Sequence, residues 1–260
     1  MANKITKDKL ITYLMIATVL IVLLILLLVN RESFFNKIKL NFVDKKNYVE
    51  LFKGLWNTIF ITIVAFILGL IIGAIVCLVE GLQSQNAFIL ILKKITKVYV
   101  SIFRGTPTTV QLLIIYFVIF ASYKGNTIFI AMLTFGLNSG AYVSEILRGG
   151  INAVPVGQME AGRSLGLSYG TVMKKIIFPQ AIKNALPSLG NEFITLIKET
   201  SIAGFIGAID LTLAFRKIAN ATYDFQTVYL VMGVVYFVIV LLITIGLKQI
   251  ERRLFKYAKA

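Results

Sequence analysis

Long apolar runs separated by short polar segments are the main feature of the chain. A helix of about 20 apolar residues crosses the hydrocarbon core of a bilayer. Six stretches come close to that length, at residues 10–29, 54–79, 101–122, 127–147, 187–209 and 228–247. The pattern therefore predicts an all-α integral membrane protein with about six transmembrane helices.

The first run, residues 10–29, has the length of a membrane helix. A signal peptide has a shorter apolar core and a small-residue cleavage site, and neither is visible here. We therefore expect a transmembrane anchor that starts in the cytoplasm. The polar connector that follows, residues 30–53, should then lie outside, although its six lysines and arginines favour the cytoplasmic side. An amphipathic helix on the membrane surface is an alternative for this connector.

The remaining polar segments agree with the rule that positive charge stays in the cytoplasm. Lys93, Lys94 and Lys97 lie in one such segment, and the tail after residue 247 is strongly basic. Both termini are therefore expected in the cytoplasm. In the second run, Gly69 and Gly73 are four residues apart, which has two interpretations: a close approach by another helix, or filler between lipid-facing leucines.

The longest polar segment between apolar runs covers residues 149–190, and its punctuation predicts two short helices. Pro155 suits the first turn of a helix over residues 156–165. Gly166 then supplies the left-handed residue that ends a helix, and Ser168 is a plausible N-cap for a second helix over residues 169–177. Pro179 should bend or break that helix.

Beyond these helices, Pro187 and Gly190 are expected to mark the return to the membrane.

The same segment resembles the signature loop of the membrane subunits of ABC importers. The matching residues are Glu160, Ala161, Gly162, Gly166, Ile176, Phe178 and Pro179, with every interval of that signature intact. Two letters depart from it, because Gly162 stands where alanine is usual and Phe178 where leucine is usual. A glycine at position 162 is expected to loosen the first helix by roughly 1 kcal/mol relative to alanine.

Three further stretches are similar to the branch of that family that takes up polar amino acids. They are residues 103–112 (FRGTPTTVQL), 141–151 (AYVSEILRGGI) and 187–201 (PSLGNEFITLIKETS). The resemblance extends from about Gly54 to the C-terminus. It implies a permease domain at 54–260 with a five-helix core and a cytoplasmic coupling loop at 149–190. Residues 1–53 would form an added N-terminal anchor and outer connector.

The resemblance also implies partners and roles. A second permease subunit, identical or paralogous, a cytoplasmic dimer of ABC ATPases and an extracytoplasmic solute-binding protein would complete an importer for a polar amino acid in a bacterial-type plasma membrane. The helix at 156–165 would dock in a groove of the ATPase, with Met159, Ala161 and Leu165 as apolar contacts and Glu160 and Arg163 as charged ones. The residues implied in coupling are Glu160, Ala161, Gly162, Arg163, Gly166 and Pro179.

Composition and residue counts exclude several classes of function and site. Hydrophobic residues make up 58% of the chain, and the net charge of +15 comes from loops and the tail, which favours membrane topology over nucleic-acid binding. With one cysteine and no histidine, the chain has no intrachain disulfide and no His-based catalytic or metal site. It lacks the phosphate-binding G-x-x-x-x-G-K-[ST] motif, so ATP should be bound by the partner ATPase and no cofactor is expected here.

Polar residues inside the predicted helices are candidates for a substrate passage, because such residues usually face a bundle interior or a wet cavity. Asn138, Tyr142 and Glu145 share one face of the fourth helix. On the fifth, Lys198 and Glu199 should lie on the order of 18 Å beyond Pro187.

Thr195 lies close to that pair in the sequence. These side chains have two interpretations: hydrogen bonds between helices, contributing roughly 0.6 kcal/mol each, or donors and acceptors for an α-amino acid. Which of Lys198 and Glu199 would face the passage stays open, since adjacent residues point about 100° apart. The alternative function is an ion-coupled secondary transporter that uses Glu145 or Glu199, although no inverted repeat is evident.

Overall fold

A computed structural model of the chain describes residues 18, 21, 22, 31–82 and 84–256. The anchor predicted at residues 10–29 therefore falls almost entirely outside the described residues. Every regular element in the described part is helical, which confirms the all-α prediction. The elements are α2 (Arg31–Ile38), η1 (Lys39–Asp44), α3 (Tyr48–Gly81), α4 (Ala87–Gly105), α5 (Thr108–Ile114), η2 (Ile115–Ile119), α6 (Thr127–Asn152), α7 (Val156–Ser164), α8 (Tyr169–Val172), η3 (Met173–Ile177), α9 (Phe178–Glu199), η4 (Thr200–Ile206), α10 (Leu211–Thr222) and α11 (Phe225–Lys256).

The chain divides into two compact units. The larger holds Phe52–Ala214 and the chain from Ile239 onward; the smaller holds the chain up to Leu51 and Phe215–Val238.

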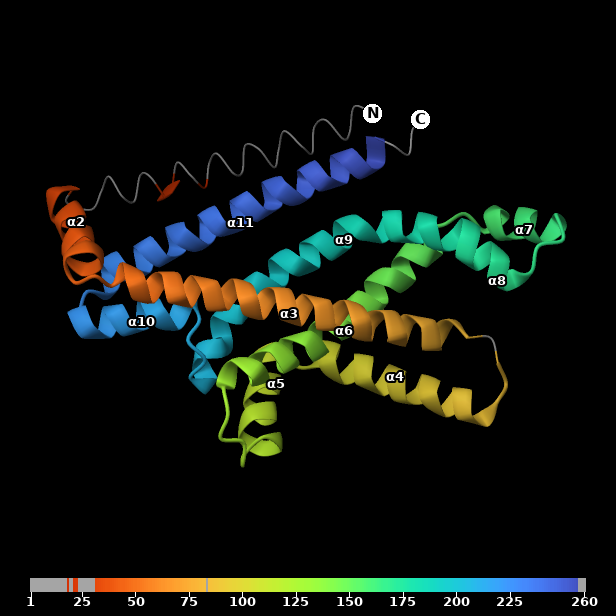
Figure 1. Ribbon diagram of the computed structural model, residues 1–260, viewed down its shortest axis with the longest axis horizontal. Helices are drawn as coiled ribbons and strands as arrows, with labels where there is room; N and C mark the ends of the chain where they lie inside the picture. The colour runs from red at the N-terminus through yellow and green to blue at the C-terminus, as the bar shows by residue number, and fades with distance from the viewer. Residues whose placement is uncertain (1–17, 19–20, 23–30, 83, 257–260) are drawn as a thin grey trace. The chain divides into compact units, whose positions relative to one another are not determined.

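Helix α6 is the centre of the larger unit and packs along α9 and α4 (Figure 1). Lipid tails are as apolar as leucine, so close packing rather than exclusion from water favours association of helices in a membrane. Buried apolar side chains of α3, α5, η2, α6, α9 and η4 fill the space between them. They include Ile61, Ala65, Leu112, Ile115, Ile130, Phe135, Leu196 and Ile206.

The two glycines of α3 face α6, which favours a close approach of helices over the interpretation as filler. A β-carbon at position 73 would lie 2.5 Å from Val143 Cγ1, and one at position 69 would lie 2.8 Å from Ser139 Cβ. Any side chain at these positions would push the two helices apart, so Gly69 and Gly73 set their distance.

Among the described residues, Tyr48–Gly81, Thr127–Asn152 and Phe225–Glu251 are long and apolar enough to cross a bilayer. They correspond to the predicted helices at 54–79, 127–147 and 228–247. The other two predictions that fall on described residues, at 101–122 and 187–209, need correction.

The third predicted helix is not a single rod. Helix α4 begins at Ala87, so Lys93, Lys94 and Lys97 stand on a helix rather than in a loop. The chain then bends by 111° before Thr108–Ile119 continues the path. Pro107 explains the break, because proline lacks an N–H and disfavours helical backbone in the residue before it. Thr106 is accordingly extended, with φ −127° and ψ 150°.

The fifth predicted helix begins earlier than expected. Helix α9 starts at Phe178 and runs through Pro187 to Glu199, where the backbone tightens into the 3₁₀ turn η4. A proline inside a helix removes one hydrogen bond, and packing on a neighbouring helix can offset that loss. Here Ala181 and Ala185 are buried on the side of Gly150 of α6, in the turns that precede the proline.

Asp210 joins η4 to α10 and is fully buried. Its carboxylate accepts hydrogen bonds from the backbone N–H groups of Thr212 and Leu213, both at 3.0 Å, which caps α10. Burial raises the pKa of Asp210 to about 6, and the backbone hydrogen bonds oppose that rise. The N-terminal part of α3 is joined to the same turn, since Asn57 Nδ2 donates to Ile209 O and Thr58 Oγ1 accepts from Leu211 N.

In the smaller unit, the connector predicted as a polar loop is helical. Asn41 Nδ2 donates to Asp224 Oδ2 at 2.9 Å, and the rings of Phe42 and Phe215 meet edge to face at 6.0 Å. Lys217 forms an ion pair with Glu50 at 3.1 Å. These contacts join η1 and the first turn of α3 to α10 and to the residue before α11.

Candidate functional site

The first helix of the polar segment, α7, ends in a Schellman turn. Gly166 has φ +80°, in the left-handed region that favours glycine. Its N–H donates to Arg163 O at 3.0 Å, and Leu167 N donates to Gly162 O at 3.2 Å. These are the two hydrogen bonds that define the motif. The Arg163 guanidinium adds a third, donating from Nη1 to Leu167 O at 2.9 Å.

The second helix starts where the sequence predicts. Ser168 Oγ accepts from Thr171 N at 3.3 Å and so caps α8. Helix α8 then passes through the π-helical turn η3, which ends at Ile177. The chain does not break at Pro179. Helix α9 begins at Phe178 directly after η3, so the missing N–H of the proline falls where the π-helical turn passes into the α-helix.

The two short helices share a small apolar core, formed by Val154, Val172, Ile177 and Ala181 with Met159, Leu167 and Met173 against them. Gly162 is buried on the same side, and a β-carbon there would lie 2.7 Å from Val172 Cγ2. The glycine that departs from the alanine of the family signature thus makes room for a branched side chain opposite it. The close contact with Val172 opposes the loosening of α7 that we expect from a glycine at position 162.

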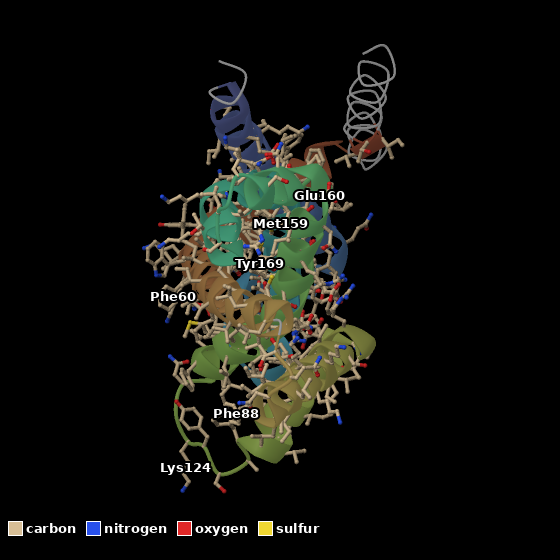
Figure 2. The ribbon with its side chains drawn as sticks, turned by 90° about the vertical axis from the view of Figure 1, so that its right-hand side faces the viewer. Phe60, Phe88, Lys124, Met159, Glu160 and Tyr169 are labelled. Atoms are coloured by element: carbon tan, nitrogen blue, oxygen red, sulfur yellow. The ribbon has the colours of Figure 1, made fainter. Side chains whose placement is uncertain are left out.

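The outer face of α7 is open. Glu160, Ala161 and Arg163 are exposed. Val156 and Leu165 are exposed as well, with exposed fractions of 73% and 80%. Met159, expected among the outward contacts, instead packs into the shared core. Figure 2 looks onto this end of the chain, where it labels Met159, Glu160 and Tyr169.

The three candidate residues of α6, Asn138, Tyr142 and Glu145, reach the chain around the bend between α4 and α5. Asn138 is buried and donates from Nδ2 to Gln111 Oε1 at 2.8 Å and to Phe103 O at 3.3 Å. Gln111 Nε2 in turn donates to the carbonyls of Phe103 and Thr106, both at 2.9 Å. The two amides therefore satisfy carbonyls that the break at Pro107 leaves without helical partners. This arrangement favours the interpretation of Asn138 as a structural hydrogen-bonding residue.

Tyr142 and Glu145 meet Arg104 instead. The Arg104 guanidinium lies 5.5 Å from the centre of the Tyr142 ring and 3.5 Å from Glu145 Oε2. Glu145 also pairs with Arg148, one turn along α6. Arg104, Tyr142 and Glu145 line a cavity of about 390 Å³, which Asn184 and Ser188 of α9 close on the other side. This cavity offers cationic and anionic groups side by side.

The candidates on α9 do not reach that cavity. Thr195 and Lys198 are exposed in the isolated chain, and Glu199 interacts with the Thr108 side chain of α5. In the described part of the chain, the ion pairs are Arg104–Glu145, Arg148–Glu145 and Lys217–Glu50. Adjacent Lys198 and Glu199 therefore do not pair with each other.

Two functional candidates in the structure are absent from the site residues predicted from the sequence. Glu192 accepts a hydrogen bond from Ser139 of α6 at 2.7 Å, and Arg104 is the cation of the 390 Å³ cavity. Glu192 is seven residues before Glu199, so helical periodicity places both on one face of α9. That spacing was the available signal for Glu192. No signal in the sequence pairs Arg104 with α6.

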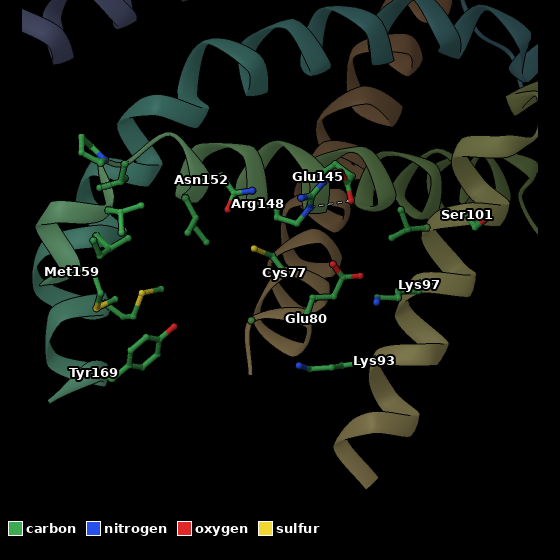
Figure 3. A pocket seen from close by; sticks show the side chains of 18 residues that line it. Cys77, Glu80, Lys93, Lys97, Ser101, Glu145, Arg148, Asn152, Met159 and Tyr169 are labelled. Atoms are coloured by element: carbon green, nitrogen blue, oxygen red, sulfur yellow. Dashed lines mark hydrogen bonds and ion pairs between the residues drawn. The ribbon is translucent and has the colours of Figure 1, made fainter. Parts of the chain in front are cut away.

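A larger cavity of about 970 Å³ lies between the C-terminal ends of α3 and α6, the middle of α4, and helices α7 and α8 (Figure 3). Glu145 lines both cavities. The larger one separates the shared core of α7 and α8 from charged side chains of α4.

The chain is similar to a known family and to individual relatives in it. Residues 87–256 match the family described as binding-protein-dependent transport system inner membrane component. The arginine transport system permease protein ArtQ of Bacillus subtilis (strain 168) is 39% identical over 206 residues, which are 78% of this chain and 92% of ArtQ. The putative glutamine transport system permease protein GlnP of Rickettsia typhi is 39% identical over 206 residues, with the same two shares.

A solved structure agrees as well. In the crystal structure of an amino acid ABC transporter with histidines, one chain is 37% identical, with a TM-score of 0.74, and the match covers 80% of this chain and 95% of that one. The family match covers well over half of the residues and includes α7, α8 and the signature loop they form. The chain therefore belongs to the binding-protein-dependent inner membrane components, the permease subunits of ABC importers.

Proposed function

We propose that the chain is the transmembrane permease subunit of an ABC importer for a polar amino acid, coupled to a separate ATPase through residues 156–165. The observation that carries this proposal is the α7–α8 pair. A Schellman turn fixes α7 against α8, and the pair leaves Glu160, Val156 and Leu165 exposed at one end of the larger unit. A rigid helix with an exposed charge and exposed apolar side chains suits docking in a groove of another protein.

Coupling would follow from how this pair continues into the bundle. Helices α8, η3 and α9 form one uninterrupted helical path from Tyr169 to Glu199. Because α7 and α8 share a core, they would move together when the ATPase closes, and the motion would pass directly into α9. Glu160, Ala161, Gly162, Arg163, Gly166 and Pro179 are the residues we assign to this coupling. Such rigid-body movement is a common way to switch access between two sides of a membrane.

The proposal includes partners that this chain needs. ATP is bound by the partner ATPase dimer, since the sequence lacks a phosphate-binding loop. A second permease subunit would cover the face of α9 where Thr195 and Lys198 are exposed. An extracytoplasmic binding protein would deliver the substrate. Because the ATPase is cytoplasmic, α7 and α8 would face the cytoplasm of a bacterial cell. Both termini would lie on the same side of the plasma membrane.

A polar amino acid fits the charges near α6. Its carboxylate needs a donor such as Arg104, and its ammonium needs an acceptor such as Glu145; these two side chains lie 3.5 Å apart. Tyr142 lines the same cavity. The relatives' names give arginine and glutamine as cargo, which supports this class of substrate. We assign Tyr142 and Glu145 to the substrate passage, with Asn138 as a supporting residue and Thr195, Lys198 and Glu199 as contributors from α9.

The test is reconstitution with an ABC ATPase of the amino acid uptake type and a binding protein. Uptake into proteoliposomes should require ATP and should be indifferent to ion gradients. Uptake driven by an ion gradient without ATP would instead establish a secondary transporter.

Charge reversal separates docking from folding in the same assay. Glu160→Lys should prevent association with the ATPase while the purified permease stays folded. Lys124→Glu is the matched control, because Lys124 is exposed and Figure 2 labels it far from Glu160. Equal ATPase binding by both variants would contradict docking at α7.

A further inference from the structure

The 970 Å³ cavity has one charged wall. Lys93 and Lys97 stand one turn apart on α4, and Figure 3 shows both pointing toward Glu80 of α3. Arg148 of α6 also lines the cavity and is paired with Glu145. That pair is neutral, so two lysines face one carboxylate. The cavity therefore carries a net positive charge and suits an anionic group.

The lysines are available to such a group. In the described part of the chain, neither Lys93 nor Lys97 has a carboxylate within 4.0 Å, since the ion pairs there involve Arg104, Arg148 and Lys217. Across the cavity, Met159 and Tyr169 point inward from α7 and α8 (Figure 3). A molecule held by the lysines would thus lie against the two short helices.

A separate apolar pocket lies beside the cavity. Cys77 and Ile151 line both the cavity and this pocket of about 70 Å³ between α3, α6 and α9. The walls of that pocket are apolar, with Ala74, Leu147 and Ile182 among them. A charged cavity beside an apolar pocket, with two lining residues in common, suits a ligand with an anionic head and a hydrocarbon chain. A water-soluble anion would use only the charged half.

We propose that this cavity binds an anionic phospholipid. The phosphate lies between Lys93 and Lys97, and the start of one acyl chain enters the pocket beside Ala74. Basic pockets between transmembrane helices on the cytoplasmic side are known to hold anionic lipid head groups. That the cavity lies at the inner membrane surface rests on the proposed function, which places α7 and α8 in the cytoplasm. A bound lipid would contact Met159 and Tyr169 and so stabilise the position of α7 and α8.

The test measures lipid retention by the purified, full-length permease alone, so its outcome does not depend on transport or on an ATPase. The protein is exchanged into detergent with phosphatidylglycerol or phosphatidylcholine, and bound lipid is counted by native mass spectrometry. Phosphatidylglycerol should be retained in preference to phosphatidylcholine. Lys97→Gln should weaken its retention about fivefold, the effect of one basic residue near an anionic lipid surface, and Lys97→Arg should preserve it.

The matched control is Lys94→Gln, which removes the same charge from an exposed position of α4 outside the cavity. It should leave retention unchanged. Equal losses for Lys94→Gln and Lys97→Gln would show that only general surface charge attracts the lipid, which overturns the proposal.

A second pair of measurements distinguishes a lipid from a soluble phosphate. Ala74→Leu fills the apolar pocket without changing any charge and should reduce retention of phosphatidylglycerol. Glycerol 3-phosphate, which has the same phosphate chemistry and no acyl chain, should fail to displace the lipid at equal concentration. Full retention by Ala74→Leu, or displacement by glycerol 3-phosphate, would overturn the assignment of a phospholipid. Size-exclusion profiles and thermal unfolding show whether each variant is folded.

Discussion

Gly162 of α7 and Val172 of α8 are in contact so close that a β-carbon at position 162 would lie 2.7 Å from Val172 Cγ2. The family signature has alanine where this chain has glycine. The exchange is therefore paired with a branched side chain on the facing helix. Together the two residues set how near α7 lies to α8.

This contact predicts a compensating pair of substitutions. Gly162→Ala alone should destabilise the α7–α8 pair, because overpacking costs typically 1–3 kcal/mol and the better helix propensity of alanine returns only about 1 kcal/mol. Gly162→Ala combined with Val172→Ala should recover part of the loss. Proteolysis rates within residues 156–177 of the purified protein measure the effect in a double-mutant cycle. Additive costs for the two substitutions would show that the residues are not coupled.

Gly166 should tolerate asparagine and reject valine. A β-branched residue at positive φ is strongly disfavoured, whereas asparagine often occupies the left-handed position at a helix end. With Gly166→Val we expect loss of ATP-driven uptake while the membrane bundle still assembles. Gly166→Asn is the control, with activity near that of the native chain. Uptake and ATP hydrolysis are measured in the same proteoliposomes. Normal coupling in the valine variant would remove the turn from the coupling mechanism.

Glu199 should affect cationic cargo more than neutral cargo. It has no ion pair with Lys198 in the described chain, so Glu199→Gln leaves no stranded partner charge there. The substitution keeps size and hydrogen bonding but removes the charge that a cationic side chain would feel. The measurement is uptake of arginine and glutamine per assembled complex. Equal uptake of both, or loss of assembled protein regardless of cargo, would contradict a place for Glu199 in the passage.

Asp210 predicts a pH dependence of stability. Burial raises the pKa of Asp210 in the folded state to about 6, above the usual range of an aspartate, so the folded state resists ionisation. As pH rises from about 4 to 6, the unfolded chain loses this proton first, and stability falls through that window. Asp210→Asn should abolish this component while still capping α10, and Asp210→Ala should lose roughly 0.5–2 kcal/mol of capping. Thermal unfolding in detergent at several pH values provides the measurement. An unchanged pH profile in Asp210→Asn would contradict the assignment.

The proposed orientation predicts opposite labelling at two exposed lysines. Cysteines are introduced at Lys124 and Lys175 in a Cys77→Ser background. The neighbouring residues Asn126 and Ser168 are left unchanged because they cap helices. A membrane-impermeant thiol reagent applied to whole cells should label only the cysteine at position 124. Inverted membrane vesicles should give the reverse result. Labelling of position 175 from outside would reverse the topology.

The sequence by itself determined the elements whose hydrogen bonds are local. The turn at Gly166, the cap at Ser168 and the two short helices around them depend on partners within six residues, so the letters alone predict them. The apolar runs at 54–79, 127–147 and 228–247 likewise predict helices α3, α6 and α11. In each case the favourable interactions lie within the predicted segment.

Only the tertiary structure decided features whose partners are distant in the chain. The run at 101–122 predicts a single helix, whereas the structure breaks it at Pro107. Carbonyls at the break are satisfied by Gln111, whose own amide oxygen accepts from Asn138, 27 residues away. Glu192 meets Ser139 across a separation of 53 residues. Helix α9 continues through Pro187 although the letters predict a start there. A local pattern specifies which backbone groups lack partners, whereas packing of α6 against α4, α5 and α9 determines which distant side chains supply them.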